Sequence, residues 1–378
     1  MNTIYLIGAG LFNIICSRIL AKNGYKCIIL EKRKHIGGNC YDEIYPNTKI
    51  LNHVYGPHII HSDNYDFIKW LSDFDKLDFF HHEVKTKYKN KLYSMPINLS
   101  TINDFFDTNL NPNEVKKFLQ DLSKKYYKDS YNNMEEKCLS LIGMELYEAF
   151  FKTYTYKQWN KYPIQLPSET ISRIPIRTNY QTSYYKKKYS FIPHNGYTEL
   201  FKKILKHENI SIELNKNIKL KDIKNLIVKG KVIYTGAIDE LFEYEFGELE
   251  YRSLYFEVEK LDINDFQGIS VINYPELEYN YTRITEAKHF YPHKNLGENT
   301  IISKEYSTDF KLNSKLDRYY PINTNTNNNL YAKYLDKSKK YDNLYIEGRL
   351  GKYIYTDMEN TFNNAILFLE REFKCQLA

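Results

Sequence analysis

Residues 3–31 read TIYLIGAGLFNIICSRILAKNGYKCIILE, and this stretch decides the fold. A short apolar run at residues 4–7 leads into Gly8 and Gly10, and residues 11–20 repeat apolar side chains at helical spacing. A second apolar run, residues 27–30, ends on the acidic residue Glu31. This order predicts a strand, a glycine turn, a helix and a second strand, which together form one βαβ unit.

The same stretch also predicts a ligand. Glycine at positions 8 and 10 lets the backbone turn tightly and approach a pyrophosphate, which then lies at the positive end of the helix. Glu31 follows at about the 20-residue distance at which dinucleotide-binding folds place the carboxylate that binds a ribose hydroxyl. Asn13 takes the place of the usual third glycine, where a small residue allows close packing of helix and strand. In spite of this departure we expect a bound dinucleotide.

The composition is that of a soluble globular protein with two or three domains, because 42% of the 378 residues are hydrophobic and 26% are charged. No run reaches the roughly 18 consecutive apolar residues of a membrane helix, and the apolar start lacks a basic leader. We therefore expect neither a membrane span nor a signal peptide. The five cysteines form no CxxC pair and their number is odd, which favours free thiols in a reducing, cytoplasmic location.

Arginine is rare, which makes its positions informative. Nine of the 53 basic residues are arginines. A planar, bidentate guanidinium is hard to replace where the geometry of a phosphate or carboxylate matters. The lysines instead alternate with acids along the chain, as on a solvated surface. A non-catalytic nucleic-acid-binding protein, suggested by the net charge of +6 and the 37 tyrosines, is not favoured, since its basic residues should cluster with the aromatic ones.

Three local patterns allow both a functional and a structural interpretation. The Gly37–Gly38 pair can bring backbone N–H groups to a phosphate or a flavin, or it can form a surface turn. His58 and His61 can donate hydrogen bonds beside a cofactor or lie in the core. No cysteine or carboxylate cluster completes a metal site around them, and we expect no bound metal. Phe150 and Tyr154, at i and i+4, can stack on a nucleobase or pack in the core.

The rest of the pattern predicts the order of the structural units. Residues 71–156 read as helical and strongly charged. Strands are expected at 211–218, at 225–234 with a turn at 229–230, and within an antiparallel sheet over 250–306. Residues 323–329 are expected to form a surface loop, 344–347 a strand and 348–349 a turn, with Asp357 as the N-cap of a last helix. This last strand and helix would rejoin the N-terminal sheet.

Motifs spread in order over nearly the whole chain resemble the UDP-galactopyranose mutase family. In the first half they are GAGLF (8–12), EKRKHIGGN (31–39), YGPHIIH (55–61), YTYKQW (154–159) and SRIPIR (172–177). In the second half they are YTG (234–236), EYRSL (250–254), YTRI (281–284), YYPI (319–322) and GRLGKYIYTDM (348–358). Several of these matches are long, and chance does not explain their common order.

The resemblance implies an α/β fold in which a discontinuous Rossmann-like domain binds FAD and is joined to a small helical domain and a six-stranded antiparallel sheet domain. The FAD-binding domain would comprise residues 1–75, 191–245 and 321–378, and the helical domain residues 76–165. Residues 166–190 would begin the substrate-side sheet and form a mobile loop. Residues 246–320 would form the antiparallel sheet domain.

The resemblance also implies an isomerase that interconverts the pyranose and furanose forms of a nucleotide sugar, expected to be a UDP sugar. N5 of reduced FAD would attack the anomeric carbon and expel the nucleoside diphosphate, which gives a covalent flavin–sugar adduct. An external electron donor would keep the flavin reduced. The enzyme would be a cytoplasmic homodimer, and its product, galactofuranose in the family, would supply capsule or cell-surface polysaccharide synthesis.

The family motifs assign roles to individual residues. Arg173 and Arg283 match the pair that grips the diphosphate, and His61 matches a histidine close to the flavin, so these three are the expected catalytic residues. The expected substrate-binding residues are Phe150, Tyr154, Trp159, Tyr184, Tyr185, Asn273, Tyr320, Tyr355 and His82. The expected FAD-binding residues are Gly8, Gly10, Leu11, Phe12, Glu31, Lys32, Gly38, Asn39, His58, Arg252, Gly236, Arg349, Asp357 and Met358.

Two departures from the family pattern concern the sugar. His82 falls near the place where relatives often carry an asparagine, and Tyr185 adds a hydroxyl where phenylalanine is usual. An added polar group must find a partner, so the alternative to UDP-galactose is UDP-N-acetylgalactosamine, UDP-arabinose or a dTDP- or GDP-deoxysugar. A rival of another class is an amine-oxidase-like flavin oxidoreductase, which would leave SRIPIR and YTRI without a role.

Overall fold

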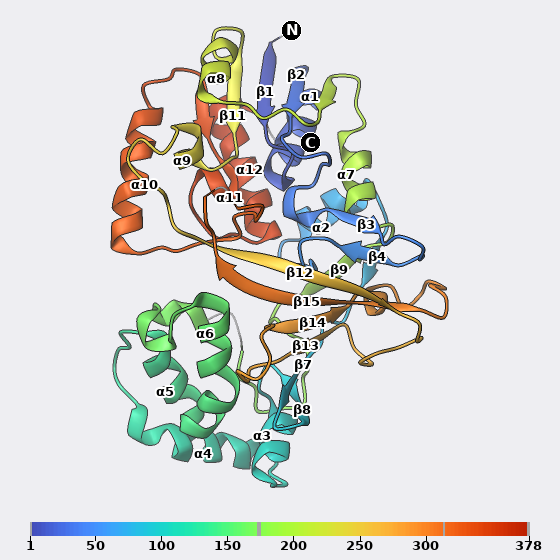
Figure 1. Cartoon of the computed structure of the whole chain (residues 1–378), viewed down its shortest axis with the longest axis vertical. Helices are drawn as coiled ribbons and strands as arrows, with labels where there is room; N and C mark the ends of the chain where they lie inside the picture. Colours follow the sequence, from blue (N-terminus) through green and yellow to red (C-terminus); the bar gives the residue numbers. More distant parts are fainter. Residues whose placement is uncertain (1, 172–174, 313, 376–378) are drawn as a thin grey trace.

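Five parallel strands form the first sheet, in the order β10–β2–β1–β11–β17 (Figure 1). The structure, a computed structural model, describes residues 2–171, 175–312 and 314–375. The predicted βαβ unit is confirmed as β1 (Thr3–Ile7), α1 (Leu11–Lys22) and β2 (Lys26–Leu30). The other strands come from later segments, namely β10 (Ile210–Glu213), β11 (Lys231–Tyr234) and β17 (Leu344–Ile346). As expected, the last strand rejoins the N-terminal sheet.

Alternate side chains of β1 enter two separate apolar clusters, so helices cover both faces of this sheet. On the face to which Leu6 points, α1 packs against α12 (Met358–Phe373) and α7 (Tyr197–Leu205). On the face to which Ile7 points lie α8 (Leu220–Leu226), α9 (Ile238–Leu241) and α10 (Asn325–Ser338). Asp357 caps α12 as predicted, because its side chain accepts the Asn360 N–H at 2.8 Å.

A seven-stranded sheet forms the second unit, in the order β16–β12–β15–β14–β13–β7–β8. Its strands are β7 (Val84–Tyr88), β8 (Lys91–Met95), β12 (Tyr251–Leu261), β13 (Val271–Asn273), β14 (Arg283–Glu286), β15 (Thr300–Asp309) and β16 (Tyr320–Pro321). The expectation of six antiparallel strands is corrected, since there are seven and β7 runs parallel to β13. The parallel pair arises because β7 and β13 belong to distant segments that no hairpin connects.

The helical unit consists of α3 (Leu99–Phe106), α4 (Pro112–Ser123), α5 (Met134–Tyr147), a π-helix over Glu148–Lys152, and α6 (Thr153–Trp159). Its predicted start at residue 71 is wrong. After α2 (Tyr65–Ser72), residues 77–95 form three strands: β6 (Leu77–Phe79), β7 and β8. β6 has only three residues, and β7 (VKTKY) alternates lysine with less polar residues, so shortness and charge hid the period of two.

Smaller sheets complete the described chain. β5 (Ile60–Ser62) and β6 pair on either side of β9 (Tyr189–Pro193), and β3 (Asp42–Ile44) pairs with β4 (Leu51–His53). In Figure 1 the parallel sheet lies at one end of the molecule and α3–α6 at the other, and the long strands β12 and β15 cross between them. Among the described residues, none of the helices combines the length and apolar character needed to span a bilayer.

Three local predictions are corrected. The strand expected at 225–234 begins only at Lys231, because α8 extends to Leu226 and residues 227–230 form a turn, which includes the turn expected at 229–230. The loop expected at 323–329 is the start of α10, whose N-cap Thr324 accepts the Asn327 N–H. The turn expected at 348–349 opens a short helix, α11 (Gly348–Gly351). In the last two cases, residues typical of turns occupy the first turn of a helix.

Candidate functional site

A cavity of about 1670 Å³ lies where the parallel sheet, the seven-stranded sheet and the helical unit meet. Its wall includes Gly8 and Gly10 from the first βα turn, Arg283 from β14, and Tyr154 from α6. Pockets for one small ligand usually measure about 300–1,000 Å³. This cavity therefore has room for a dinucleotide together with a second ligand.

The first βα turn leaves open space beside the N-terminus of α1. Gly8 adopts a φ of +98°, and a Cβ there would lie 2.5 Å from the Thr235 hydroxyl, so only glycine fits. Gly10 is the N-cap of α1, and a Cβ on it would meet nothing within 4 Å. Because a glycine N-cap has no side-chain acceptor, the N–H groups of the first turn are available to an anion in this space.

Asn13 strengthens the turn in which it replaces the third glycine. Its side-chain amide donates to the carbonyl of Gly8 at 2.8 Å and to that of Ile7 at 3.1 Å, and it lies 3.3 Å from the Thr235 hydroxyl. The side chain is fully buried. Packing of helix and strand therefore accommodates asparagine by hydrogen-bonding it to the strand end.

Glu31 lies at the end of β2 with its carboxylate fixed by the backbone. One oxygen accepts the Ala9 N–H at 2.6 Å and the other accepts the Arg33 N–H at 2.7 Å. Each carboxylate oxygen has a second lone pair, which can accept a ribose hydroxyl. The glycine turn, the open helix N-terminus and this carboxylate together fit the pyrophosphate and ribose of FAD.

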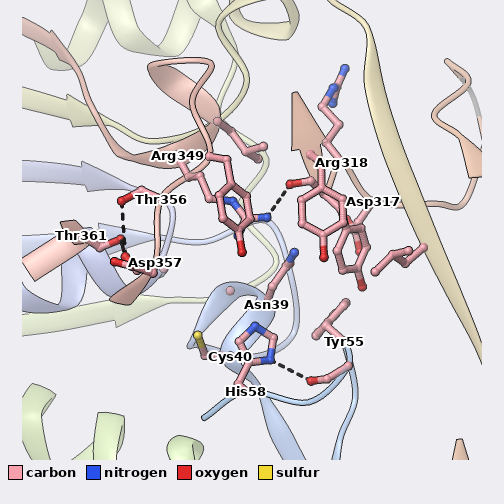
Figure 2. A pocket seen from close by; sticks show the side chains of 18 of the residues that line it. Asn39, Cys40, Tyr55, His58, Asp317, Arg318, Arg349, Thr356, Asp357 and Thr361 are labelled. Carbon is pink, nitrogen blue, oxygen red and sulfur yellow. Dashed lines mark hydrogen bonds between the residues drawn. The ribbon is translucent and has the colours of Figure 1, made fainter. Parts of the chain in front are cut away.

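Arg33 is a cavity residue that the sequence reasoning did not single out. Its guanidinium lies 2.8 Å from an Asp317 carboxylate oxygen, donates to the Asn39 side-chain oxygen at 3.1 Å, and lies 4.5 Å from the centroid of the Tyr55 ring. Figure 2 shows Asn39, Tyr55 and Asp317 around the same part of the cavity. The rarity of arginine was the available signal, but Asp317 is too distant in sequence for the pair to be predicted.

The cofactor end of the cavity also contains His58, Arg349 and Asp357 (Figure 2). Burial lowers the pKa of His58 to about 3, so this imidazole is neutral, and its Nδ1 hydrogen-bonds the Gly56 carbonyl at 2.8 Å. Arg349 donates to the Tyr319 carbonyl at 2.5 Å, and its guanidinium carbon lies 5.5 Å from the centroid of the Tyr355 ring. A fixed cation is thereby held beside the aromatic rings of the second half of the cavity.

Arg283, also in the cavity wall, is held in place by a carboxylate. Its Nε lies 2.7 Å and its Nη2 2.6 Å from Glu305 Oε2, across the pair that these residues form between β14 and β15. Glu305 is buried, and its other oxygen accepts the Thr282 hydroxyl at 3.2 Å. Burial alone would lower the pKa of Arg283, but the charge of Glu305 outweighs it and the pKa is raised. The guanidinium is therefore charged and held in one orientation.

His61 and His82 form a hydrogen-bonded pair in the same wall. His61 Nε2 lies 3.1 Å from His82 Nδ1, and the Tyr185 ring packs edge-on against His61 at 4.7 Å between centroids. Burial lowers the pKa of His61 to about 4 and that of His82 well below its usual value. Both rings are thus neutral at pH 7, and one N–H lies between them.

Aromatic side chains line the remaining wall. Phe150 is packed against Tyr88, Tyr93 and Phe105, so it belongs to the core, and it also lines the cavity. Stacking of Phe150 and Tyr154 on a nucleobase stays a prediction. The Tyr154 hydroxyl lies 3.5 Å from the Asn273 side-chain oxygen. Trp159 and Tyr320 face each other at 5.9 Å between centroids.

The cavity brings together nearly all predicted site residues. Those that line it are Gly8, Gly10, Leu11, Phe12, Glu31, Lys32, Gly38, Asn39, His58, His61, His82, Phe150, Tyr154, Trp159, Tyr184, Tyr185, Gly236, Asn273, Arg283, Tyr320, Arg349, Tyr355, Asp357 and Met358. Arg173 lies outside the described residues.

Arg252 is the described exception. It is absent from the cavity wall, and its buried guanidinium binds the Gln158 carbonyl at 3.0 Å, the Ser307 hydroxyl at 2.9 Å and the Asp309 carboxylate. These contacts join β12 and β15 to the end of α6. The contacts described here are structural, and its place next to the flavin stays a prediction.

Comparison with known proteins agrees with this site. The UDP-galactopyranose mutase family model matches residues 149–355, and the NAD(P)-binding Rossmann-like domain model matches residues 6–74. The dTDP-fucopyranose mutase of Escherichia coli is 38% identical over 370 residues, which cover 97% of each chain. The probable UDP-galactopyranose mutase of Klebsiella pneumoniae is 38% identical over 365 residues, which cover 97% of this chain and 93% of that protein.

The overall architecture also has a close counterpart. The crystal structure of a reduced UDP-galactopyranose mutase matches 98% of this chain and 95% of its own with a TM-score of 0.75, at 15% identity, which confirms the fold. The fold, the cavity and the two relatives place the chain in one family. It belongs to the UDP-galactopyranose mutase family, and it is an FAD-dependent isomerase that interconverts the pyranose and furanose forms of a nucleotide sugar.

Proposed function

We propose that the enzyme changes the ring size of a nucleotide-activated hexose or deoxyhexose by covalent catalysis at the anomeric carbon. Reduced FAD, when bound, supplies the nucleophile, its N5. The observation that supports this proposal is the position of Arg283, which shares one cavity with the glycine turn and the helix N-terminus of α1. A cation for a departing diphosphate and a dinucleotide site thus open into the same space.

Arg283 and three tyrosines form the proposed diphosphate site. The diphosphate gains negative charge as its bond to the anomeric carbon breaks, and a guanidinium already held by Glu305 needs little reorganisation to stabilise it. Burial raises the pKa of Tyr154, Tyr184 and Tyr320 above the usual value near 10, so their hydroxyls stay protonated and can donate to phosphate oxygens. Arg173 remains the proposed second arginine that binds the diphosphate.

The proposed sugar-binding site consists of His61, His82 and Tyr185. A neutral histidine pair offers both donor and acceptor nitrogens. A sugar that lacks a hydroxyl, or carries an additional one, changes which of these nitrogens form a hydrogen bond. The Escherichia coli relative is named for dTDP-fucopyranose and the Klebsiella pneumoniae one for UDP-galactopyranose, at equal identity. We therefore propose a deoxysugar nucleotide as a substrate candidate on the same footing as UDP-galactose.

The test is a substrate panel with dithionite-reduced enzyme. UDP-galactose, UDP-N-acetylgalactosamine, UDP-arabinose, dTDP-fucose and a GDP-deoxysugar are incubated separately, and furanose products are separated by chromatography. We expect furanose from at least one sugar with reduced enzyme and none with oxidised enzyme. Consumption of one reductant per product would instead indicate an oxidoreductase, and galactose as the sole good substrate would overturn the proposal of another sugar.

The cellular setting belongs to the same proposal. We propose that an external electron donor reduces the FAD, that the enzyme works as a cytoplasmic homodimer, and that its furanose product supplies cell-surface polysaccharide synthesis. Light scattering of the FAD-loaded protein tests the dimer. Reduction of the flavin by NADH or NADPH, followed as bleaching of its visible absorption, tests two candidate donors.

A further inference from the structure

Two imidazoles and a carboxylate converge outside the cavity, next to β6, which is an edge strand of the three-stranded sheet. Asp78 lies in β6, His194 directly follows β9, and His293 follows the 3-10 helix Ala287–Phe290. His194 Nδ1 lies 2.6 Å and His293 Nε2 3.1 Å from the same oxygen, Asp78 Oδ2. The two rings stack with centroids 4.8 Å apart. None of the three lines the large cavity, so the mutase reaction does not account for them.

The backbone and Lys76 fix this arrangement. β6 and β9 pair antiparallel, with Asp78 opposite Ile192, which places His194 beside the carboxylate. The His194 N–H donates to the Lys76 carbonyl at 2.9 Å. Lys76 Nζ lies 2.9 Å from Asp78 Oδ1 and thereby leaves Oδ2 facing the two rings. The convergence is thus built by two strands and a distant loop.

The three ligand atoms have the chemistry and spacing of a metal site. Imidazole nitrogen and carboxylate oxygen bind Zn²⁺ at about 2.0–2.2 Å, and tetrahedral ligands then lie about 3.3 Å apart. All three atoms here lie within 4.8 Å of one another, so small side-chain rotations reach that spacing. We propose that Asp78, His194 and His293 bind one Zn²⁺ ion, with water completing the tetrahedron.

Access from solvent agrees with this proposal. The side chains of His194 and His293 are 31% and 34% exposed, which lets an ion enter and leaves room for a water ligand. A bound ion would join the loop after the 3-10 helix to the sheet whose third strand, β5, contains His61. The proposed role is therefore structural, and it does not depend on the proposed substrate.

A second cluster supplies the matched control. Asp265, Glu286 and His289 also lie within 4.8 Å of one another. The Glu286 carboxylate, however, accepts the backbone N–H groups of Phe266 and Gln267 and the Thr300 hydroxyl. A carboxylate engaged in this way is a poor metal ligand, so this cluster is explained by its hydrogen bonds.

The experiment uses tag-free, FAD-loaded, full-length protein freed of metal by a chelator and then dialysed. Zn²⁺ is titrated by calorimetry, and Co²⁺ by its visible absorption as a difference from the flavin spectrum. We expect one equivalent of Zn²⁺, the intense absorption of four-coordinate Co²⁺, and a higher melting temperature with Zn²⁺. His293→Ala should weaken binding at least tenfold, and His289→Ala should leave it unchanged.

A second variant, His293→Gln, controls for loss of Zn²⁺ binding through misfolding. Its fold is checked by FAD content and circular dichroism. Weaker Zn²⁺ binding in a folded His293→Gln protein supports the site. The proposal is overturned if the wild-type protein binds no stoichiometric Zn²⁺, or if His293→Ala binds it as tightly as the wild type. In either case Asp78 serves only as a hydrogen-bond acceptor for the two rings.

Discussion

Arg283 on β14 and Glu305 on β15 lie opposite each other on neighbouring strands, and both Nε and Nη2 of the arginine lie within 2.7 Å of one carboxylate oxygen, Oε2. Because Glu305 is buried, it has little freedom to move away from this contact. The glutamate thereby sets the direction in which the remaining guanidinium N–H groups point, and these are the groups through which Arg283 would bind the proposed diphosphate.

Glu305→Gln should therefore lower kcat at least tenfold with little change in FAD content, because the amide keeps the shape but loses the charge that orients Arg283. Steady-state kinetics with the best sugar from the panel measure the effect. The matched control is Glu259→Gln on β12, a half-exposed residue 3.7 Å from Lys304, which should leave kcat unchanged. Equal kcat in the Glu305 variant and the wild type would contradict the orienting role.

His82→Asn should change which sugar is preferred. It replaces one member of the His61–His82 pair and so alters the donors and acceptors that would face the sugar in the proposed site. We expect the ratio of kcat/KM between UDP-galactose and a deoxysugar nucleotide to shift at least tenfold, with FAD retained. His81→Asn, a half-exposed neighbour bonded to Glu83, serves as the control. An unchanged kcat/KM ratio would show that His82 does not belong to the sugar-binding site.

Buried neutral histidines should make the protein acid-labile. Burial lowers the pKa of His53 and His58 to about 3 and that of His61 to about 4, against about 6.5 in an unfolded chain. Between about pH 4 and 6.5 the unfolded chain therefore binds protons that the folded chain does not, and stability falls as pH falls through this window. Above about pH 6.5 these histidines add no pH dependence to the free energy of unfolding.

The free energy of unfolding in urea, measured from about pH 4.5 to 8, tests this. Each histidine contributes about 1.4 kcal/mol per pH unit within the window. His53→Gln should reduce the slope by one proton, since it removes one of the titrating rings while its neighbour Phe290, stacked at 4.9 Å, remains. A slope that His53→Gln leaves unaltered would show that His53 is not buried as a neutral ring.

Lys157 should prove a structural lysine. Its Nζ donates to the carbonyls of Tyr274 at 2.6 Å, Glu276 at 3.2 Å and Tyr281 at 2.5 Å, and so fastens α6 to the loop between β13 and β14. Lys157→Met leaves part-buried carbonyls without this donor and should lower the free energy of unfolding by about 1–3 kcal/mol. It should also raise KM, because Asn273 and Arg283 flank that loop. Lys152→Met, which breaks only a solvent-exposed pair with Glu148, should cost well under 1 kcal/mol.

Gly10→Ala should separate FAD binding from folding. Gly10 has a φ of −79°, which alanine adopts, and its Cβ would enter the open space beside the N-terminus of α1. We expect FAD retention to fall at least tenfold while the melting temperature of the apoprotein changes by a few degrees. Gly8→Ala should fail to fold, because of its positive φ and the contact with Thr235. Full FAD retention in Gly10→Ala would place the pyrophosphate elsewhere.

The parts of the fold that local patterns specify could be predicted. The first βαβ unit and the cap at Asp357 depend on residues within a few turns of one another, and both are confirmed. β6 to β8 escaped prediction because these strands are short and, in β7, alternating lysines obscure the apolar face. α10 escaped because its asparagines favour turns when read alone, and only packing on the sheet selects the helix.

In the site, too, local patterns could be predicted and contacts between distant segments could not. The glycine turn and Glu31 follow from spacing in one segment, whereas most other cavity residues came from the family motifs. The pairs that fix the geometry, Arg33 with Asp317 and Arg283 with Glu305, join segments whose contact no sequence pattern encodes. The convergence of Asp78, His194 and His293 is hidden in the sequence for the same reason, because three distant segments supply its side chains.

The late position of β17 in the chain has a consequence for biosynthesis. Its partner β11 and the N-terminal βαβ unit leave the ribosome well before residue 344, yet the walls of the FAD site include residues 8–12 and 348–358. Until residues 344–346 have been translated, β11 is the edge strand of the nascent sheet, and its unpaired backbone groups are open to other chains. We therefore expect FAD to bind only after residues 348–358 have been synthesised, and a chain cut off before α12 to be isolated without flavin.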